Sequence, residues 1–553
     1  MSRWATTRGG TALVVAAALV VVTVTLGACT GDDPQPTTTG PGPGIDTGPV
    51  NGGRLVVAVA DDGGGVVPAG PPWSPEQLQI ARAVYDRLAV YDDSYQLQPQ
   101  LAESIESDRE FTRWTITLRD GVVFTDGTPL DAAVVRRNLD AQRATPAGSV
   151  ALGPVESVFV TGPRTVVVTT RAPWSTFPHV LAGQVGFIAS PGTLDDPGAA
   201  TAPVGSGPFR VTAWVPGSTV ELVRNSSYWQ EDLPHVDEVV FRVLPEEAER
   251  VDALRSGRVD VALSADPVSL GRLLDDAAGG ALTLVVDRDA EAPKATFVLN
   301  VAEPPFLDPV ARSAVVAATD RAALHEAAFP DVYDAVKGPT SDGSVWFDDA
   351  PLPPRDLQRA RRDAARYAEI YGEPLAFTVL VPTDVTSSRL ASEWRRQLAT
   401  AGIEVTVELL PPAEVQARAS LGAFEATLLA LFGTWHPDSW YPVLHRALMT
   451  PPGAAGVNLA RFGTAGIDDA LDAARATGDF AEQVELYRRV QEELLAGGAY
   501  LPVVRLTPGV AAGADVRDLT VWTTATGRPG LATEDGTVDL TGVWLDRPPA
   551  PAE

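Results

Sequence analysis

Residues 201–263 constrain the fold of this chain more than any other stretch. Gly205, Gly207 and Pro208 form a tight entry turn, and the turn dipeptide Pro216-Gly217 separates two segments of alternating apolar and polar side chains. Strands are predicted at 209–214, 219–223, 239–244 and 259–263, with a helix at 246–256. A strand, a short helix and a second strand in succession predict a βαβ crossover, so the chain should contain an α/β sheet.

The rest of the chain repeats this alternation of strand-like and helix-like segments. Asp131 is a plausible N-cap for the helix that follows it, and Gly402 is placed to end another. Further strands are predicted at 54–60, 163–170, 374–381, 403–409 and 500–506, and helices at 75–90, 312–328, 387–401 and twice within 467–497. This pattern favours an α/β architecture throughout.

The amino terminus has the pattern of a bacterial lipoprotein signal. Arg3 and Arg8 precede an uncharged, apolar stretch at 11–28, which ends in Leu-Gly-Ala before Cys29. We therefore predict a signal peptide at 1–28, lipidation of Cys29 and a flexible tether at 29–53, where Gly, Pro, Thr and Asp dominate. A plain transmembrane anchor is the alternative, because the apolar stretch is long enough to span a bilayer. Cys29 is the only cysteine, so no internal disulfide is possible.

Three sequence stretches resemble the extracellular solute-binding proteins of family 5, the dipeptide, oligopeptide and nickel binding proteins of ABC importers. The first is 201–263, with PVGSGPF, W.PG, EL.RN..YW, LP.VDEVVFRV.P and AL.SG.VDVA in order. The second, from 101 to 135, contains LAES, LRDGVVFTDGTPL and a following helix. The third, from 295 to 324, contains LN, PPF.D and DRAAL.

The resemblance implies an α/β, two-lobe, periplasmic-binding-protein-like fold of type II, cluster C, with an extra subdomain inserted in the first lobe. We place the first lobe at 54–290, its inserted subdomain at about 90–200, the second lobe at 291–500 and a return to the first lobe at 501–548. The loop 61–73 would face the cleft between the lobes. A ligand that contacts both lobes would favour the closed form.

The sequence gives no sign of catalytic, metal-dependent or nucleic-acid chemistry. The formal net charge is −28 and no basic patch appears, which argues against nucleic acid as a partner. His325 and Glu326 begin an HExxH-like motif, but Phe329 stands where the second His would be. No phosphate-binding loop, nucleophile elbow or dinucleotide fingerprint is present. We therefore expect a binding protein without cofactor, resident metal or catalytic residues.

Residues 432–440 are the strongest candidate for the ligand site. Family members have a similar run, GW.ADYPDP, whose first Asp pairs with the amino group of a peptide; here Thr434 or Trp435 takes that position, and Asp438 matches only the later acidic one. The loop 382–388, where the family has an Arg for the peptide carboxylate, contains Thr383 but no Arg. The standard anchors for a peptide are therefore in doubt.

Aromatic walls and a few polar groups suit a solute site, so we predict ligand contacts from this loop and from two further positions. The alternative is that the Trp residues are ordinary core residues; we assign Trp114, Trp214 and Trp229 to the core and rank Trp73 and Tyr85 as weaker candidates. The predicted ligand-binding residues are Thr434, Trp435, His436, Asp438, Trp440, Trp346 and Thr383.

The functional hypothesis is a lipid-anchored, monomeric receptor that delivers an oligopeptide or other small polar solute to an ABC permease and its ATPase. A surface sensor or scaffold of the same fold is the alternative, and sequence does not separate the two. An exported hydrolase is the third and weakest hypothesis.

Overall fold

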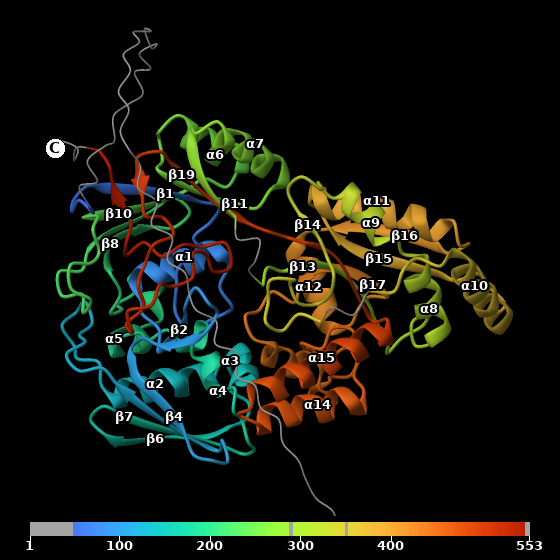
Figure 1. The fold of residues 1–553 in the computed structure, drawn as a ribbon, viewed down its shortest axis with the longest axis horizontal. Coiled ribbons are helices and arrows are strands. Elements are labelled where there is room, and N and C mark those ends of the chain that lie inside the picture. Colours follow the sequence, from blue (N-terminus) through green and yellow to red (C-terminus); the bar gives the residue numbers. More distant parts are fainter. Residues whose placement is uncertain (1–47, 287–290, 349–351, 548–553) are drawn as a thin grey trace, which may run out of the picture. The chain divides into compact units, whose positions relative to one another are not determined.

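The computed structural model describes residues 48–286, 291–348 and 352–547 (Figure 1). Cys29, the predicted signal peptide and the predicted tether up to residue 47 lie outside the described residues. The last part of that tether is held in place, because the Gly52 N–H donates a 2.8 Å hydrogen bond to the carbonyl oxygen of His235. None of the described helices is both long enough and apolar enough to span a bilayer.

The first lobe is built on a seven-stranded sheet. Its order is β12 (Leu282–Val286), β19 (Gly509–Gly513), β11 (Val261–Ser264), β1 (Arg54–Val59), β10 (Glu238–Val243), β9 (Thr219–Arg224) and β8 (Phe209–Val215). Strand β1 pairs in parallel with both β10 and β11, and helix α6 (Glu247–Arg255) connects those two strands. The predicted hairpin and βαβ crossover are both confirmed. Gly257, with φ +68°, follows α6 in the left-handed conformation that ends a helix.

The second lobe contains a six-stranded mixed sheet, coloured yellow to red in Figure 1. Its order is β14 (Asp334–Ala335), β18 (Tyr500–Arg505), β13 (Lys294–Leu299), β17 (Ala426–Leu431), β15 (Ala376–Pro382) and β16 (Glu404–Leu410). All six residues of β13 are buried, as expected of a central strand with both faces covered. Because β18 belongs to this sheet, the chain returns to the first lobe after Arg505, later than the predicted boundary at 500.

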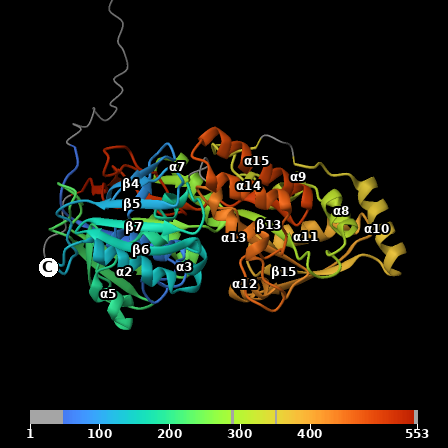
Figure 2. The same ribbon diagram turned by 90° about the horizontal axis from the view of Figure 1, so that it is seen from below.

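A third sheet lies inside the predicted insertion at 90–200. Its antiparallel order is β4 (Ala102–Ser107), β5 (Arg113–Leu118), β7 (Thr165–Thr170) and β6 (Val155–Gly162), and the strands run side by side in Figure 2. Helix α2 (Ala132–Arg143) packs against β6 and β7. Asp131 caps α2 as predicted, since its side chain accepts the Val134 N–H at 2.9 Å.

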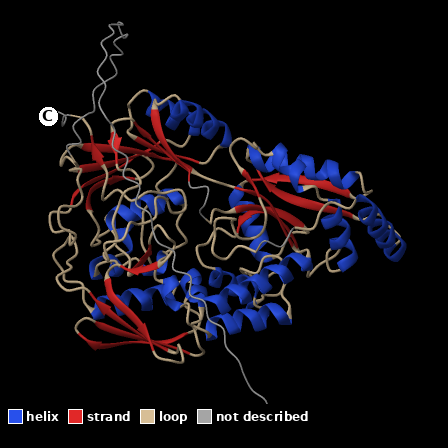
Figure 3. Cartoon of the chain, viewed as in Figure 1, coloured by secondary structure: helices blue, strands red, loops and turns tan. Residues whose placement is uncertain are grey.

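The remaining elements pack around these three sheets (Figure 3). Two small two-stranded antiparallel sheets pair β2 (Ala89–Tyr91) with β3 (Leu97–Pro99) and β20 (Val516–Arg517) with β21 (Trp544–Leu545). The other α-helices are α1 (Pro75–Val84), α3 (Pro146–Ala151), α4 (Phe177–Val180), α5 (Pro191–Asp195), α7 (Pro267–Ala278), α8 (Pro309–Ala318), α9 (Arg321–Ala327), α10 (Leu357–Tyr371), α11 (Val385–Ala399), α12 (Pro412–Leu421), α13 (Tyr441–Leu444), α14 (Ala465–Ala476) and α15 (Phe480–Gly497). The 3-10 helices are η1 (Gln184–Gly186), η2 (Pro197–Thr201), η3 (Pro437–Trp440) and η4 (Arg446–Leu448).

Two predicted helices differ from the structure. The helix predicted at 75–90 ends at Val84, because Tyr85 is extended (φ −120°) and the chain continues into β2. The helix predicted at 312–328 is two helices, α8 and α9. Asp320 separates them and caps α9, since its side chain accepts the Ala323 N–H. Helical spacing of apolar residues does not reveal such a break when both helices bury the same face.

The Gly-Ser-Gly turn that opens residues 201–263 docks on the end of α1. The Gly207 N–H donates a 2.9 Å hydrogen bond to the carbonyl oxygen of Val84. A Cβ atom on Gly205 or Gly207 would lie only 2.1 or 2.5 Å from backbone atoms of Val84. Both glycines are therefore needed for this close approach of two backbone segments.

Candidate functional site

A cavity of about 440 Å³ lies between residues of the two lobes. This volume falls within the range of about 300–1,000 Å³ typical of small-molecule sites. The first lobe supplies Gly70 and Pro72, from the loop expected to face the cleft, together with residues of the inserted subdomain and of the chain's end. The main polar and aromatic lining residues are Tyr91, Gln142, Trp174, His179, Gln184, Glu534 and Asp535 from the first lobe and Thr434, Trp435, His436, Asp438, Ser439 and Arg475 from the second.

The second-lobe loop that lines the cavity is fixed where it leaves β17. Phe432 adopts a left-handed conformation (φ +60°), and its carbonyl oxygen accepts a 3.0 Å hydrogen bond from Nζ of Lys294. Lys294 is buried, and its Nζ lies 2.8 Å from Oε2 of Glu291. Burial lowers the pKa of Lys294, while the charge of Glu291 and the hydrogen bond to it oppose that shift. The buried pair thus sets the direction in which the loop enters the cavity.

Trp435 bridges the two lobes. Its ring stacks on Tyr95 of the first lobe, with centroids 5.3 Å apart and planes at 20°, and it packs against the core of the inserted subdomain. The indole Nε1 is buried and has no hydrogen-bond partner in the described structure. Trp435 is thus a wall of the cavity, and it is its ring, not the buried Nε1, that a ligand could contact.

Two imidazoles from different lobes stack in the cavity wall. The rings of His179 and His436 have centroids 3.9 Å apart. Nδ1 of His179 lies 2.9 Å from the Tyr91 hydroxyl, and Nδ1 of His436 accepts the Asp438 N–H at 3.1 Å. Burial lowers the pKa of His179 to about 4, although the charge of Asp438 opposes the shift. Burial, His179 and Arg475 hold the pKa of His436 well below its usual value. Both rings are therefore neutral at pH 7.

Asp438 is the centre of a buried polar contact between the lobes. Its carboxylate accepts two hydrogen bonds from Arg475 of α14, at 2.6 and 3.0 Å, and one from Nε1 of Trp174 of the first lobe, at 3.0 Å. The neighbouring Ser175 N–H donates to the Arg475 carbonyl oxygen at 2.7 Å. Asp438, for which we predicted a ligand contact, lines the cavity, but its charge is already compensated by Arg475.

The other predicted ligand residues divide into two groups. Thr434 lines the cavity and is exposed. Trp346 stands behind the wall, edge-on to His436 with centroids 4.6 Å apart, and lines a separate cavity of about 10 Å³. Trp440 is 3% exposed and packs in the second-lobe core, and Thr383 lies at the end of the β15 region, outside the lining residues. Trp440 and Thr383 are thus not lining residues. Trp440 is buried in the core, and Thr383 does not line the cavity although β15 runs parallel to β17 and ends at the same edge of the sheet.

Sequence analysis missed Glu534 and Asp535, which form one wall. Glu534 is buried and receives two hydrogen bonds from Arg87, at 2.6 and 2.7 Å. Burial alone would raise the pKa of Glu534, but the charges and hydrogen bonds of Arg87 and the charge of Arg82 hold it below its usual value. Asp535 lines the cavity and keeps exposed surface there, although the surrounding walls restrict its hydration. Burial and the charge of Glu534 raise its pKa to about 7, against the opposing charges of Arg87 and Arg82.

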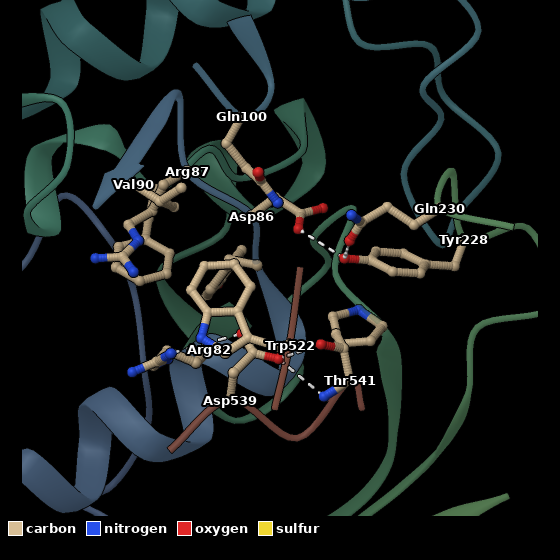
Figure 4. A pocket seen from close by; sticks show the side chains of 13 residues that line it. Arg82, Asp86, Arg87, Val90, Gln100, Tyr228, Gln230, Trp522, Asp539 and Thr541 are labelled. Carbon is tan, nitrogen blue, oxygen red and sulfur yellow. Dashed lines mark hydrogen bonds and ion pairs between the residues drawn. The ribbon is translucent and has the colours of Figure 1, made fainter. Parts of the chain in front are cut away.

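A second polar cavity lies inside the first lobe, next to the Arg82 and Arg87 side chains (Figure 4). Asp86 faces Tyr228 there and accepts its hydroxyl at 3.2 Å. Burial raises the pKa of Asp86 to about 7. The volume is about 30 Å³, room for one or two water molecules, so this cavity is too small for a solute.

The described residues contain no group of three or more His, Cys, Asp or Glu side chains that could hold a metal ion. The His179–His436 pair is therefore not part of a metal site built by the described chain alone. His325, from the incomplete HExxH-like motif, has a structural contact instead, since its Nε2 lies 2.8 Å from the Tyr333 carbonyl oxygen.

Comparison with known proteins identifies the family. Residues 96–446 match the family described as bacterial extracellular solute-binding proteins, family 5 Middle. The chain belongs to this family. The family and its structural neighbours are substrate-binding proteins and not enzymes. The function of this chain is therefore that of an extracytoplasmic solute-binding protein.

Curated relatives of this family 5 protein include the glutathione-binding protein GsiB of Escherichia coli strain K12. It is 25% identical over 456 residues, which cover 77% of this chain and 84% of GsiB. The GsiB of Pectobacterium atrosepticum is 26% identical over 440 residues, covering 76% and 83%.

Solved structures show the same fold. The binding protein AgaA from A. tumefaciens R10, in complex with agropinic acid, has a TM-score of 0.75 at 23% identity and covers 90% of this chain and 99% of its own. DppA from Helicobacter pylori, in complex with the peptide STSA, has a TM-score of 0.75 at 20% identity, with the same coverage. The predicted two-lobe fold is thereby confirmed.

Replacing Asp438 by Ala should destabilise the folded protein by about 3–5 kcal/mol, because Arg475 would remain buried without a carboxylate. Urea denaturation would measure the free energy of unfolding. Asp140→Ala is the control: its pairs with Arg136 and Arg143 are on the surface, and the loss should stay below about 1 kcal/mol. Equal effects of the two substitutions would contradict the role given to Asp438.

The neutral His179 should make stability depend on pH. Its folded pKa is lower than the unfolded value, so its contribution is complete above about pH 6.5 and is lost as the pH falls toward 4. Phe cannot titrate, so the free energy of unfolding of His179→Phe should fall less in acid than that of the wild type. The difference should reach about 3 kcal/mol at most. The free energies of unfolding of both proteins between pH 4.5 and 7.5 provide the measurement. A difference between them that does not change with pH would refute the assignment.

Proposed function

We propose that this protein is the solute-binding component of an ABC importer. It captures a small polar solute or an oligopeptide in the cavity between its lobes and delivers it, as a monomer, to a membrane permease driven by an ATPase. The observation that carries the proposal is the 440 Å³ cavity with walls from both lobes, in a chain of the family 5 solute-binding proteins. Because each lobe supplies part of the wall, a bound solute favours the arrangement in which they meet.

The chemistry of the cavity suits a solute with an apolar face and a few polar groups. Trp435 is half-buried and offers a ring for stacking, whereas Tyr91 and Trp174 are buried and complete the wall. The neutral imidazoles of His179 and His436 add no charge. Glutathione is a reasonable first probe because the relative GsiB is named for binding it. Short peptides are the second, since H. pylori DppA has this fold with a peptide bound.

Trp435→Ala should weaken solute binding at least about tenfold, roughly 1.4 kcal/mol, because the solute loses its stacking surface. A thermal-shift screen of glutathione, short peptides, sugars and chelated metals would find a ligand, since a solute that binds the native state raises the melting temperature. Titration calorimetry would then give the dissociation constant of each variant.

Trp214→Phe is the matched control for Trp435→Ala, because Trp214 packs in the first-lobe core and does not line the cavity. Its dissociation constant should equal that of the wild type. If Trp435→Ala also leaves the constant unchanged, the solute binds elsewhere. If no solute raises the melting temperature, the importer proposal itself fails.

We further propose that Cys29 carries a lipid that holds the protein at the outer face of the cell membrane. The lipobox pattern before Cys29 supports this proposal. Cys29→Ser should move the protein from the membrane fraction to the soluble fraction while leaving solute affinity unchanged. Retention of the Ser variant in the membrane would instead favour an uncleaved transmembrane anchor.

A further inference from the structure

A tight turn near the end of the chain presents a carboxylate to the solute cavity. Glu534 and Thr537 exchange backbone hydrogen bonds of 3.0 and 2.9 Å, and the two residues between them have positive φ, +50° for Asp535 and +74° for Gly536. This is the pattern of a two-residue type I′ turn, in which both central residues are left-handed. The turn fixes the backbone from which the Asp535 side chain projects.

The residues beneath the turn hold it rigidly. Glu534 is bound by both terminal nitrogens of Arg87, and Nη1 of Arg82 lies 3.4 Å from its carboxylate. The same Arg82 nitrogen donates a 3.0 Å hydrogen bond to Oγ1 of Thr537. Because both ends of the turn are bound by buried arginines, Asp535 is offered to the cavity from a preorganised support.

The charges that line the cavity leave Asp535 uncompensated. Asp438 is paired with Arg475, and Glu534 with Arg87. The two lining imidazoles are buried side by side and neutral. Within the described parts of the chain, the Asp535 carboxylate makes no hydrogen bond or ion pair. The lining therefore keeps one carboxyl group that is not paired with any described residue. A cation bound beside it would favour its ionised form and so lower its raised pKa.

An aromatic ring adjoins this carboxylate. Trp435 and Asp535 line both the solute cavity and a small neighbouring cavity of about 20 Å³, so they lie on the same side of the site. The face of an indole attracts cations, and a cation near both groups would gain from each. A solute anion would instead meet the uncompensated charge of Asp535.

We propose that Asp535 binds a cationic group of the solute, an ammonium or a guanidinium, and thereby selects solutes that carry one. The inference rests on the proposed solute-binding function. An ammonium that leaves water needs a charged partner, and the loop 432–440 offers none, because Thr434 or Trp435 stands in place of its first acidic position and Asp438 is already paired. Asp535 supplies that partner from the opposite lobe.

The test uses Asp535→Asn, which removes the charge, keeps the size and tolerates the left-handed conformation. The probes are two matched pairs: trialanine with N-acetyl-trialanine, and putrescine with 1,4-butanediol. Titration calorimetry on the full folded protein should show that the charged member of at least one pair binds at least tenfold more tightly than its uncharged counterpart. Asp535→Asn should weaken that binding at least tenfold and abolish the preference.

Asp126→Asn is the control variant. Asp126 also precedes a glycine in a tight turn, its Oδ1 accepts the Thr128 N–H at 2.9 Å, and it does not line the cavity. This variant should leave every affinity unchanged. If the effect of Asp535→Asn came from general surface charge, Asp126→Asn would weaken binding as well.

Two outcomes would overturn the inference while leaving the proposed function intact. One is that the charged and uncharged members of each pair bind equally well. The other is that the tightest solute, from these pairs or from the wider screen, binds Asp535→Asn as strongly as the wild type. Absence of binding by any solute in the screen would count against the proposed function and would remove the basis of this inference with it.

Discussion

The carboxylate of Asp438 is the interaction on which the rest of the site depends. It accepts hydrogen bonds from two nitrogens of a buried guanidinium, Nε and Nη2 of Arg475 in its own lobe, and from the indole N–H of Trp174 in the other lobe. A buried ion pair contributes little net stability but is costly to break, so it works mainly by fixing geometry. Here it fixes α14 and the loop 432–440 to each other, and through Trp174 it fixes both to the inserted subdomain.

This arrangement changes what the loop 432–440 can do. Asp438 pairs with Arg475 and holds the structure together, so it does not neutralise a charge on the ligand. The stacked imidazoles next to it remain neutral because they are buried. The second lobe thus provides shape, rings and dipoles, whereas the uncompensated charge comes from the first lobe. The loop lacks the family's first acidic residue, since Thr434 or Trp435 takes its position. In our proposal, Asp535 of the first lobe supplies a carboxylate in its place.

Sequence patterns were enough to predict most of the fold but only the second-lobe loop of the site. The 201–263 motif gave the hairpin and the crossover because strand alternation and the Gly turns are local signals. The loop 432–440 was found because it resembles a known run. Trp174, His179 and Asp535 were missed because they approach that loop only after distant segments fold together; His179 stacks on a residue more than 250 positions away. Trp440 shows the converse, since spacing alone does not tell a wall residue from one just beneath it.

The position of Glu534 and Asp535 in the chain has a consequence for when the binding site exists. Their turn completes a wall whose other parts come from earlier in the chain, between Gly70 and Arg475. A polypeptide that has not yet folded this segment therefore lacks one wall of the cavity. The cavity is complete only once the segment that contains Glu534 and Asp535 has folded into the first lobe.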